Sequence, residues 1–206
     1  LVSPDRVERT ALLMGCDPSL GILSAHLQRR KADGELVWLN GSSEAALQAL
    51  RSGEVHLAGS HLRDPATGQY NLPFARQALA GVGGLVVAFA RWEQGIIVAP
   101  GNPKAIQGIS DLARPDVRII NREPGAGARA MLDELLAEAD IPPDVVQGYD
   151  RVVTSHFALA RTIAVGGADA GIGLRAAAES FGLDLVPLAE VRFDLVIPGD
   201  QLEHPV

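Results

Sequence analysis

Short apolar runs alternate with stretches of helical period almost from one end of the chain to the other, and this alternation restricts the folds that are open to it. The pattern is typical of sheets of parallel strands that are covered by helices. In the first half, the predicted strands span residues 12–15, 36–39, 55–59, 85–90 and 95–99. The first predicted helix begins at Pro18, with Asp17 as its N-cap, and closes at 31–34. The next two predicted helices span 44–52 and lie around 74–79.

The second half repeats this plan after a change of composition around residues 100–103. A short turn is predicted at 109–112, strands at 117–120, 168–173, 183–188 and 192–197, and helices around 130–136 and at 156–165 and 174–181. With 206 residues, the chain is long for one simple domain of about 100–150 residues. We therefore predict an α/β protein with two lobes, each a mainly parallel sheet flanked by helices. Lobe 1 is expected to span 1–95 and lobe 2 to span 96–190, with a closing strand and tail near the hinge at 191–206.

Charge and cysteine content exclude several classes of function. The 18 basic and 25 acidic residues give a formal net charge of −7, which argues against direct nucleic-acid contact by this segment. Cys16 is the only cysteine, so no intramolecular disulfide can form, and this weakly favours a reducing compartment. No apolar run is long enough for a signal peptide or membrane span, so no membrane contact is predicted. The chain opens on Leu1 and reads as a fragment of a longer protein.

The candidate binding residues follow the predicted strands, because ligands of open parallel sheets bind beyond the carboxyl ends of the strands. Four segments there, 15–19, 40–43, 122–129 and 154–156, combine small or hydroxyl side chains with the N–H groups of a helix start. Such a combination can surround a small anion. The predicted ligand-binding residues are Asp17, Ser19, Ser42, Ser43, Ser60, His61, Arg122, Gly125, Gly127, Arg129, Ser155 and His156.

The segment 122–129 is the most distinctive of the four. Gly125 and Gly127 allow the backbone to approach a ligand closely, while Arg122 and Arg129 supply positive charge. The segment is not a nucleotide-binding P-loop, because the lysine and hydroxyl residue that complete such a loop are absent.

Most of these residues also have a purely structural interpretation. Serine at a helix start commonly does no more than cap the helix. His26 lies on an apolar helix face and is predicted to be a partly buried structural residue. His61 and His156 are interpreted either as donors to an anion or as structural groups. Cys16 is interpreted as a space-filling residue, with a reactive thiol as the alternative.

No arrangement of residues typical of catalysis is present in the sequence. There is no recognisable Ser-His-Asp order, paired-carboxylate motif or His-Glu-x-x-His motif. His61 and His156 lack a third partner at a spacing that would indicate a metal site. We therefore predict no catalytic residue, no metal and no cofactor, and we expect that the chain is not an enzyme.

A series of motifs resembles a known family over nearly the whole chain. The motifs occupy residues 59–62, 64–65, 70–71, 93–95, 101–103, 121–122, 124–129, 155–156 and 168–173. In this order they resemble the periplasmic-binding-protein-like domain, of the second topological type, that is fused to excisionase-type DNA-binding domains and to molybdopterin-biosynthesis proteins. Such domains are similar to molybdate- and tungstate-binding proteins. Ala126 and Ala128 depart from the pattern, which has Ser and Thr there, and this removes two hydroxyl donors.

The resemblance implies a cytoplasmic sensor that captures a small anion, such as a molybdate-type oxyanion, between its lobes. Closure would then reorient an attached DNA-binding domain. One alternative is a periplasmic or lipid-anchored receptor that delivers a solute to a transporter, if a leader precedes Leu1. Another is an accessory domain in molybdenum-cofactor biosynthesis. The sequence is also compatible with a homodimer. Such domains usually end in a further helix that packs on the first lobe, so the end at Val206 is interpreted as a truncated or partly disordered terminus.

Overall fold

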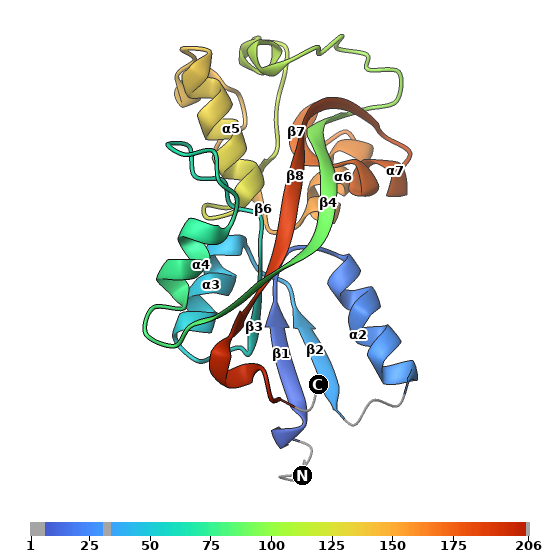
Figure 1. Cartoon of the computed structure of the whole chain (residues 1–206). Helices are drawn as coiled ribbons and strands as arrows, with labels where there is room; N and C mark the ends of the chain where they lie inside the picture. Colours follow the sequence, from blue (N-terminus) through green and yellow to red (C-terminus); the bar gives the residue numbers. More distant parts are fainter. Residues whose placement is uncertain (1–6, 31–33, 205–206) are drawn as a thin grey trace. The chain divides into compact units, whose positions relative to one another are not determined.

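The computed structural model describes residues 7–30 and 34–204, and the chain divides into two compact units. Unit 1 comprises residues 1–90 and 192–206, and unit 2 comprises residues 91–191. Two long strands, β4 (Gly84–Val98) and β8 (Asp184–Pro198), are neighbours in one sheet, and each contributes residues to both units (Figure 1). The sequence-based division instead places its boundaries after residues 95 and 190.

Unit 1 is built on the strand order β2-β1-β3-β8. The strands β1 (Thr10–Met14), β2 (Glu35–Leu39) and β3 (Leu57–Ser60) are parallel to one another, and β8 is antiparallel to β3. Helix α2 (Ser19–Arg29) lies on one side of these strands, and α3 (Ser43–Arg51) and α4 (Leu72–Ala78) lie on the other (Figure 1). The sheet and its helix layers thus follow the order of elements that the sequence predicts.

Side-chain size and helical spacing explain the packing within unit 1. Helix α3 buries Ala46, Leu47 and Leu50 against the core, because residues three and four apart share one helix face. On β3, the hydrogen of Gly59 leaves room for the ring of Phe193 on β8, which would collide with any larger side chain. The unit 1 core therefore holds β3 and β8 in close contact.

Unit 2 packs its helices around short strands. Strand β7 (Ala170–Leu174) pairs antiparallel with β4, and β5 (Asn121–Arg122) pairs parallel with β6 (Val152–Val153). An isolated parallel bridge between Ile119 and Ala170 joins the segment just before β5 to β7. The helices are α5 (Gly127–Glu138), α6 (His156–Ala164) and α7 (Arg175–Ser180), and 3-10 turns occur at Ile109–Ala113, Pro143–Val145 and, in unit 1, Gly199–Gln201.

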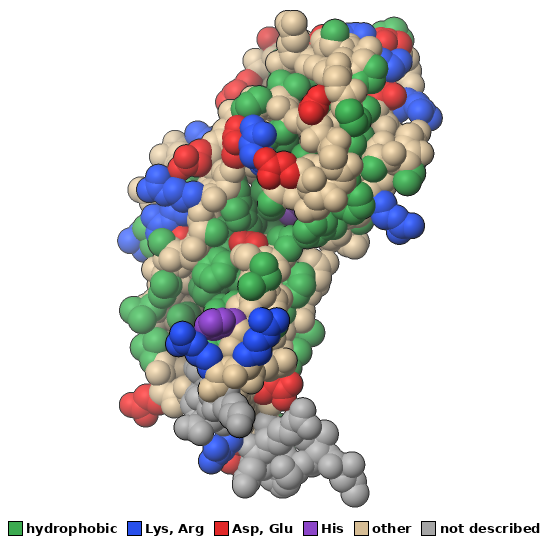
Figure 2. Space-filling view, turned by 90° about the vertical axis from the view of Figure 1, so that its right-hand side faces the viewer, with side chains coloured by type: hydrophobic (Ala, Val, Ile, Leu, Met, Phe, Trp, Pro, Cys, Tyr) green, Lys and Arg blue, Asp and Glu red, His purple; other side chains and the backbone are tan. Residues whose placement is uncertain are grey.

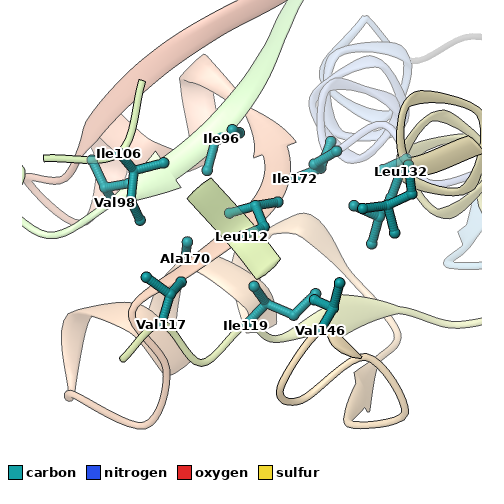
Figure 3. Close-up of a cluster of buried hydrophobic side chains, with 12 residues drawn as sticks. Ile96, Val98, Ile106, Leu112, Val117, Ile119, Leu132, Val146, Ala170 and Ile172 are labelled. Atoms are coloured by element: carbon teal, nitrogen blue, oxygen red, sulfur yellow. The ribbon is translucent and has the colours of Figure 1, made fainter. Parts of the chain in front are cut away.

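Aliphatic side chains fill one core of unit 2, and Figure 3 shows how they converge from separate segments. Leu112 of the first 3-10 turn and Leu132 of α5 are almost completely buried there, together with Ile96 and Ile172 from the paired strands β4 and β7. Because these side chains lack polar atoms, they pack the strands against α5 and leave no side-chain polar group in this core that needs a hydrogen-bond partner.

Two pairs of predicted strands prove to be single long strands. The predicted strands 85–90 and 95–99 are both part of β4, and 183–188 and 192–197 are both part of β8. The polar residues 91–94 suggest a break, but exposed Arg91 and Glu93 alternate with the less exposed Trp92 and Gln94. This two-residue period is that of a continuing strand.

Three local predictions are also wrong. The predicted strand 117–120 is replaced by the two-residue β5. Each unit also contains an antiparallel pair beside its parallel pairs, so the sheets are mixed. His26 is exposed on α2. Asp17 is not the N-cap of α2, because Pro18 takes that position and the helix begins at Ser19. The predicted helix close at 31–34 falls largely on residues outside the described part.

Two surface features bear on partners. Within residues 7–30 and 34–204, no helix is both long and apolar enough to cross a membrane. On the face drawn in Figure 2, basic side chains lie next to acidic ones. Positive charge on this face is therefore interspersed with negative charge.

Candidate functional site

Unit 1 brings the predicted residues 15–19, 40–43 and 60–62 to one edge of its sheet, here called the unit 1 edge. The register aligns Met14 with Leu39 and with Ala58, so the three parallel strands end at nearly the same level. The residues that follow each strand lie at the carboxyl-end edge, as the sequence predicts.

Most predicted side chains of the unit 1 edge bond to nearby protein groups. The Asp17 carboxylate accepts from the backbone N–H of Ser19 at 2.8 Å and from the Ser19 hydroxyl at 2.7 Å. Ser42 caps α3 by accepting from the N–H of Ala45 at 3.3 Å, and the buried Ser43 hydroxyl accepts from the N–H of His61 at 3.1 Å. These contacts shape the edge. Whether the same residues also bind a ligand stays a prediction.

A buried acidic network completes the unit 1 edge. Asp194 on β8 lies opposite Ser60 and is completely buried. Its carboxylate accepts from Arg192 Nε at 2.6 Å and from Asn71 Nδ2 at 2.9 Å. Asn71, also completely buried, has the left-handed φ of 57° and precedes α4, and its Oδ1 has no hydrogen-bond partner among the described residues.

Unit 2 has a corresponding edge, made by residues 122–129, 154–156 and Gln94, here called the unit 2 edge. Strands β5, β6 and β7 run parallel, so their carboxyl ends lie at the same edge. Arg122 is the last residue of β5, and Thr154 directly follows β6. A contact of 3.5 Å between Arg122 Nη2 and the carbonyl oxygen of Thr154 joins the two ends.

Arg122 is the principal buried cation of the unit 2 edge. Its side chain is 1% exposed and forms a two-pronged pair with Glu123, with Nε–Oε2 at 2.8 Å and Nη2–Oε1 at 2.9 Å. Its third nitrogen, Nη1, is buried and has no acceptor within the described residues. A buried guanidinium N–H without an acceptor is a donor that suits an anionic ligand.

Helix α5 begins next to Arg122 without a side-chain cap. Its N-cap residue is Ala126, and the N–H groups of Gly127 and Ala128 have no acceptor in the described part of the chain. Gly125 adopts a φ of 82°, a left-handed value that favours glycine and turns the loop into the helix. The alanines that depart from the family pattern thus remove hydroxyl donors, but they also leave backbone donors unused.

Helix α6 contributes the remaining predicted residues of unit 2. Ser155 caps it by accepting from the N–H of Ala158 at 3.0 Å. His156, the first residue of α6, is 1% exposed and makes an edge-on ring contact with Trp92, with ring centroids 6.0 Å apart. This contact links the start of α6 to the part of β4 that precedes Gln94.

Arg129 uses its charge within unit 2. Its guanidinium lies 3.9 Å from the centre of the Tyr149 ring, and its Nε lies 3.1 Å from Asp133 Oδ1. Burial raises the pKa of Tyr149, and the hydrogen bond that its hydroxyl donates to Asp133 raises it further. These contacts position α5 and give Arg129 protein partners, whereas Arg122 Nη1 has no acceptor among the described residues.

An open groove of about 660 Å³ on unit 1 lies between α3 and α4. Its lining includes Leu47 and Phe74 together with exposed polar side chains along α3. None of its lining residues is a buried polar side chain without a partner. We therefore place the candidate site at the strand ends rather than in this groove.

Known proteins match this chain over most of its length. A family model described as the PBP superfamily domain matches residues 24–206. The chain belongs to this superfamily. This PBP domain is 39% identical over 186 residues to YvgK of Bacillus subtilis strain 168, an uncharacterized protein. The match covers 90% of this chain and 60% of YvgK, so the chain spans about three fifths of that relative.

Solved structures of other PBP proteins share the fold at low identity. A phosphate transporter substrate-binding protein from Clostridium perfringens, with bound phosphate, has a TM-score of 0.71 at 14% identity and matches 95% of this chain and 89% of its own. PhnD1 from Prochlorococcus marinus, in complex with methylphosphonate, has a TM-score of 0.67 at 16% identity, with 96% and 79% covered. The CcmR regulatory domain of Synechocystis PCC6803, in complex with 2-PG, has a TM-score of 0.67 at 15% identity, with 92% and 88% covered. These matches confirm the predicted PBP-like α/β fold.

Sequence reasoning missed three buried polar residues at these edges: Asn71, Gln94 and Asp194. Gln94 and Asp194 lie within strands, where a single polar residue resembles a solvent-facing position of the alternating pattern. Asn71 and Gln94 belong to the motifs that carry the family resemblance, and this is the signal that could have pointed to them.

Proposed function

We propose that this small-solute-binding PBP domain binds an anion, with donors contributed by the unit 2 edge. The observation that carries the proposal is the buried Nη1 of Arg122, beside the uncapped start of α5. A helix N-terminus and a guanidinium both favour negative charge. The phosphate and methylphosphonate complexes of structural neighbours support an anion of modest size.

A ligand panel followed by thermal unfolding tests this proposal. The panel contains phosphate, sulfate, molybdate, tungstate and small carboxylates, since the family resemblance suggests molybdate-type oxyanions. A ligand at about a hundred times its dissociation constant adds about 2.7 kcal/mol of stability, which gives a measurable rise in melting temperature. If no anion in the panel raises the melting temperature, the proposal is wrong.

Arg122→Met identifies the residue that carries binding. Hydrogen bonds to charged groups contribute about 1.5–3 kcal/mol, so we expect affinity to fall about 10- to 150-fold by calorimetry. Arg122→Lys keeps the charge but loses the planar fork, and we expect an intermediate loss. Arg118→Met is the matched control, because Arg118 is 53% exposed and lies 3.7 Å from Asp169 in an ion pair. Affinity that is unchanged in Arg122→Met would contradict the assignment.

We further propose that the domain is a cytoplasmic sensor that regulates an attached DNA-binding domain. The match to a regulatory domain supports this role, while the matches to transporter proteins support the alternative of a solute receptor. Binding of the full-length product to its own promoter DNA, with and without the anion, distinguishes the two. DNA binding that changes with the anion supports the sensor, whereas location outside the cytoplasmic membrane supports the receptor.

A further inference from the structure

Gln94 carries a buried amide that forms no bond within the described protein. The residue is 0% exposed, and neither its Oε1 nor its Nε2 has a hydrogen-bond partner among the described residues. The oxygen and nitrogen of an amide are hard to tell apart, but here both positions are without a partner. Whichever way the amide is turned, Gln94 therefore presents one buried donor group and one buried acceptor.

Strand register places Gln94 at the unit 2 edge. Gln94 lies opposite Leu174, the last residue of β7. On the other side of β7, the bridge from Ile119 to Ala170 brings Arg122 to nearly the same level as Leu174. Two strand spacings therefore separate the backbones of Gln94 and Arg122, a distance of about 10 Å. Two long side chains at this separation can contact one small ligand.

The neighbours of Gln94 use their own polar groups. Glu93 forms an ion pair with Arg175, including a bond of 2.8 Å from Nη2 to Oε1, and this pairing lowers the pKa of the Glu93 carboxyl. Trp92 contacts the His156 ring. The charges of Glu93 and Arg175 therefore neutralise each other. In contrast, both amide atoms of Gln94 lack hydrogen-bond partners among the described residues.

The chemistry of these groups restricts the ligand. Arg122 Nη1 and the Gln94 amide nitrogen both need acceptors, which any small anion offers. The Gln94 oxygen needs a donor, and fully deprotonated sulfate, molybdate and tungstate carry none. A ligand with acceptors alone would leave the Gln94 oxygen buried and unbonded, which opposes binding.

We infer that the ligand is a small anion that also carries a hydrogen-bond donor, and that Gln94 selects for this donor. Hydroxy- and amino-carboxylates meet the requirement, as do hydrogen phosphate and hydrogen phosphonates. This inference rests on the proposed anion binding and narrows its ligand class. Fully deprotonated oxyanions are expected to bind more weakly.

Paired ligands that differ in the donor test the inference on the unaltered protein. Lactate against propionate and hydrogen phosphate against sulfate, each measured by calorimetry at pH 7.5, keep size similar while removing the donor. An unmet buried polar group weakens binding by about one to two orders of magnitude, so we expect the donor-bearing member of at least one pair to bind at least about tenfold more tightly. The pair that responds shows whether the anion is a carboxylate or a phosphorus oxyanion.

Gln94→Met assigns the selectivity to Gln94. Methionine has a similar length and no amide, so we expect the ratio of affinities within the responding pair to fall to about threefold or less. We also expect the ligand-free variant to melt at the same temperature or higher, because an apolar side chain replaces two unbonded buried groups. Gln147→Met is the control, since Gln147 is exposed and donates to the carbonyl of Pro115.

The outcomes separate this inference from the anion proposal. Binding that depends on Arg122 but shows no preference for the donor-bearing ligands overturns the inference and leaves the anion proposal intact. If Gln94→Met leaves the ratio of affinities within the ligand pair unchanged, the inference is also wrong, because the Gln94 amide then forms no selective hydrogen bond with the ligand. If no anion in the panel binds, both fail. If Gln94→Met does not fold, Gln94→Leu and the ratios of the unaltered protein decide.

Discussion

The unit 1 edge and the unit 2 edge use similar residue types but employ their buried polar groups differently. In unit 1, Asp17, Ser43 and Asp194 all bond to protein groups around them, although Asn71 Oδ1 has no partner among the described residues. In unit 2, Gln94 and one nitrogen of Arg122 remain without partners in the described chain. Satisfied groups stabilise a fold, whereas unsatisfied groups lower its stability until a ligand bonds to them. We therefore expect the unit 2 edge to depend more on a ligand for its hydrogen bonds than the unit 1 edge does.

The largest effect on stability is expected from Arg192→Met in unit 1. This change leaves the fully buried Asp194 carboxylate without its cation. We expect the free energy of unfolding to fall by about 1.5–3 kcal/mol in chemical denaturation. This loss is smaller than for a fully buried ion pair, because Arg192 is 45% exposed and solvent screens its charge.

Arg91→Met is the control for this change, because Arg91 and Glu190 are 80% and 65% exposed and their pair should contribute less than about 1 kcal/mol. Unchanged stability with loss of anion binding in Arg192→Met would break the comparison, since unit 1 would then also supply a recognition cation.

A smaller effect is expected when the helix caps are exchanged. Ala126→Ser should let a hydroxyl accept from the first turn of α5, and it should add about 0.5–1 kcal/mol of stability while weakening anion binding several-fold. Ser155→Ala should remove the cap of α6 and lower stability by about 1 kcal/mol. Thermal unfolding and calorimetry of both variants measure these changes. Stronger anion binding in Ala126→Ser would show that the new hydroxyl donates to the ligand instead of capping α5.

The smallest expected effect is a change of stability with pH, and it arises in unit 1. Burial lowers the pKa of His56, and the nearby charge of His204 lowers it further. His56 Nδ1 also accepts from the N–H of Leu12 at 2.9 Å, which requires the neutral ring. The unfolded chain, with a histidine pKa of about 6.5, therefore binds the proton more readily than the folded chain. This contribution to stability is present above about pH 6.5 and is lost as the pH falls toward the lower folded value.

Melting temperatures between pH 8 and pH 5 check this expectation. His56→Gln retains an acceptor for Leu12 and should show a shallower fall with acid than the unaltered protein. His26→Gln, at an exposed position on α2, should keep the original slope. Equal slopes in all three proteins would remove His56 as a source of the pH dependence.

The sequence motifs predicted the placement of residues that lie next to a strand end or a helix start. Arg122 and the serine caps follow predicted strands or begin predicted helices, so their placement could be deduced from residues close in sequence. Asp194 and Gln94 could not be placed in this way. Their burial depends on strands that pair across more than 70 residues of sequence.

By itself, the sequence determined the alternation of strands and helices, the two-part α/β architecture and most helix starts. These features depend on periodicity and capping, which act over a few residues. Only the tertiary structure decided that β4 and β8 run unbroken, that the sheets are mixed, and which polar groups are buried with or without partners. Burial and hydrogen-bond satisfaction are set by neighbours distant in sequence, so the two chemically different edges emerge only when the strands are paired.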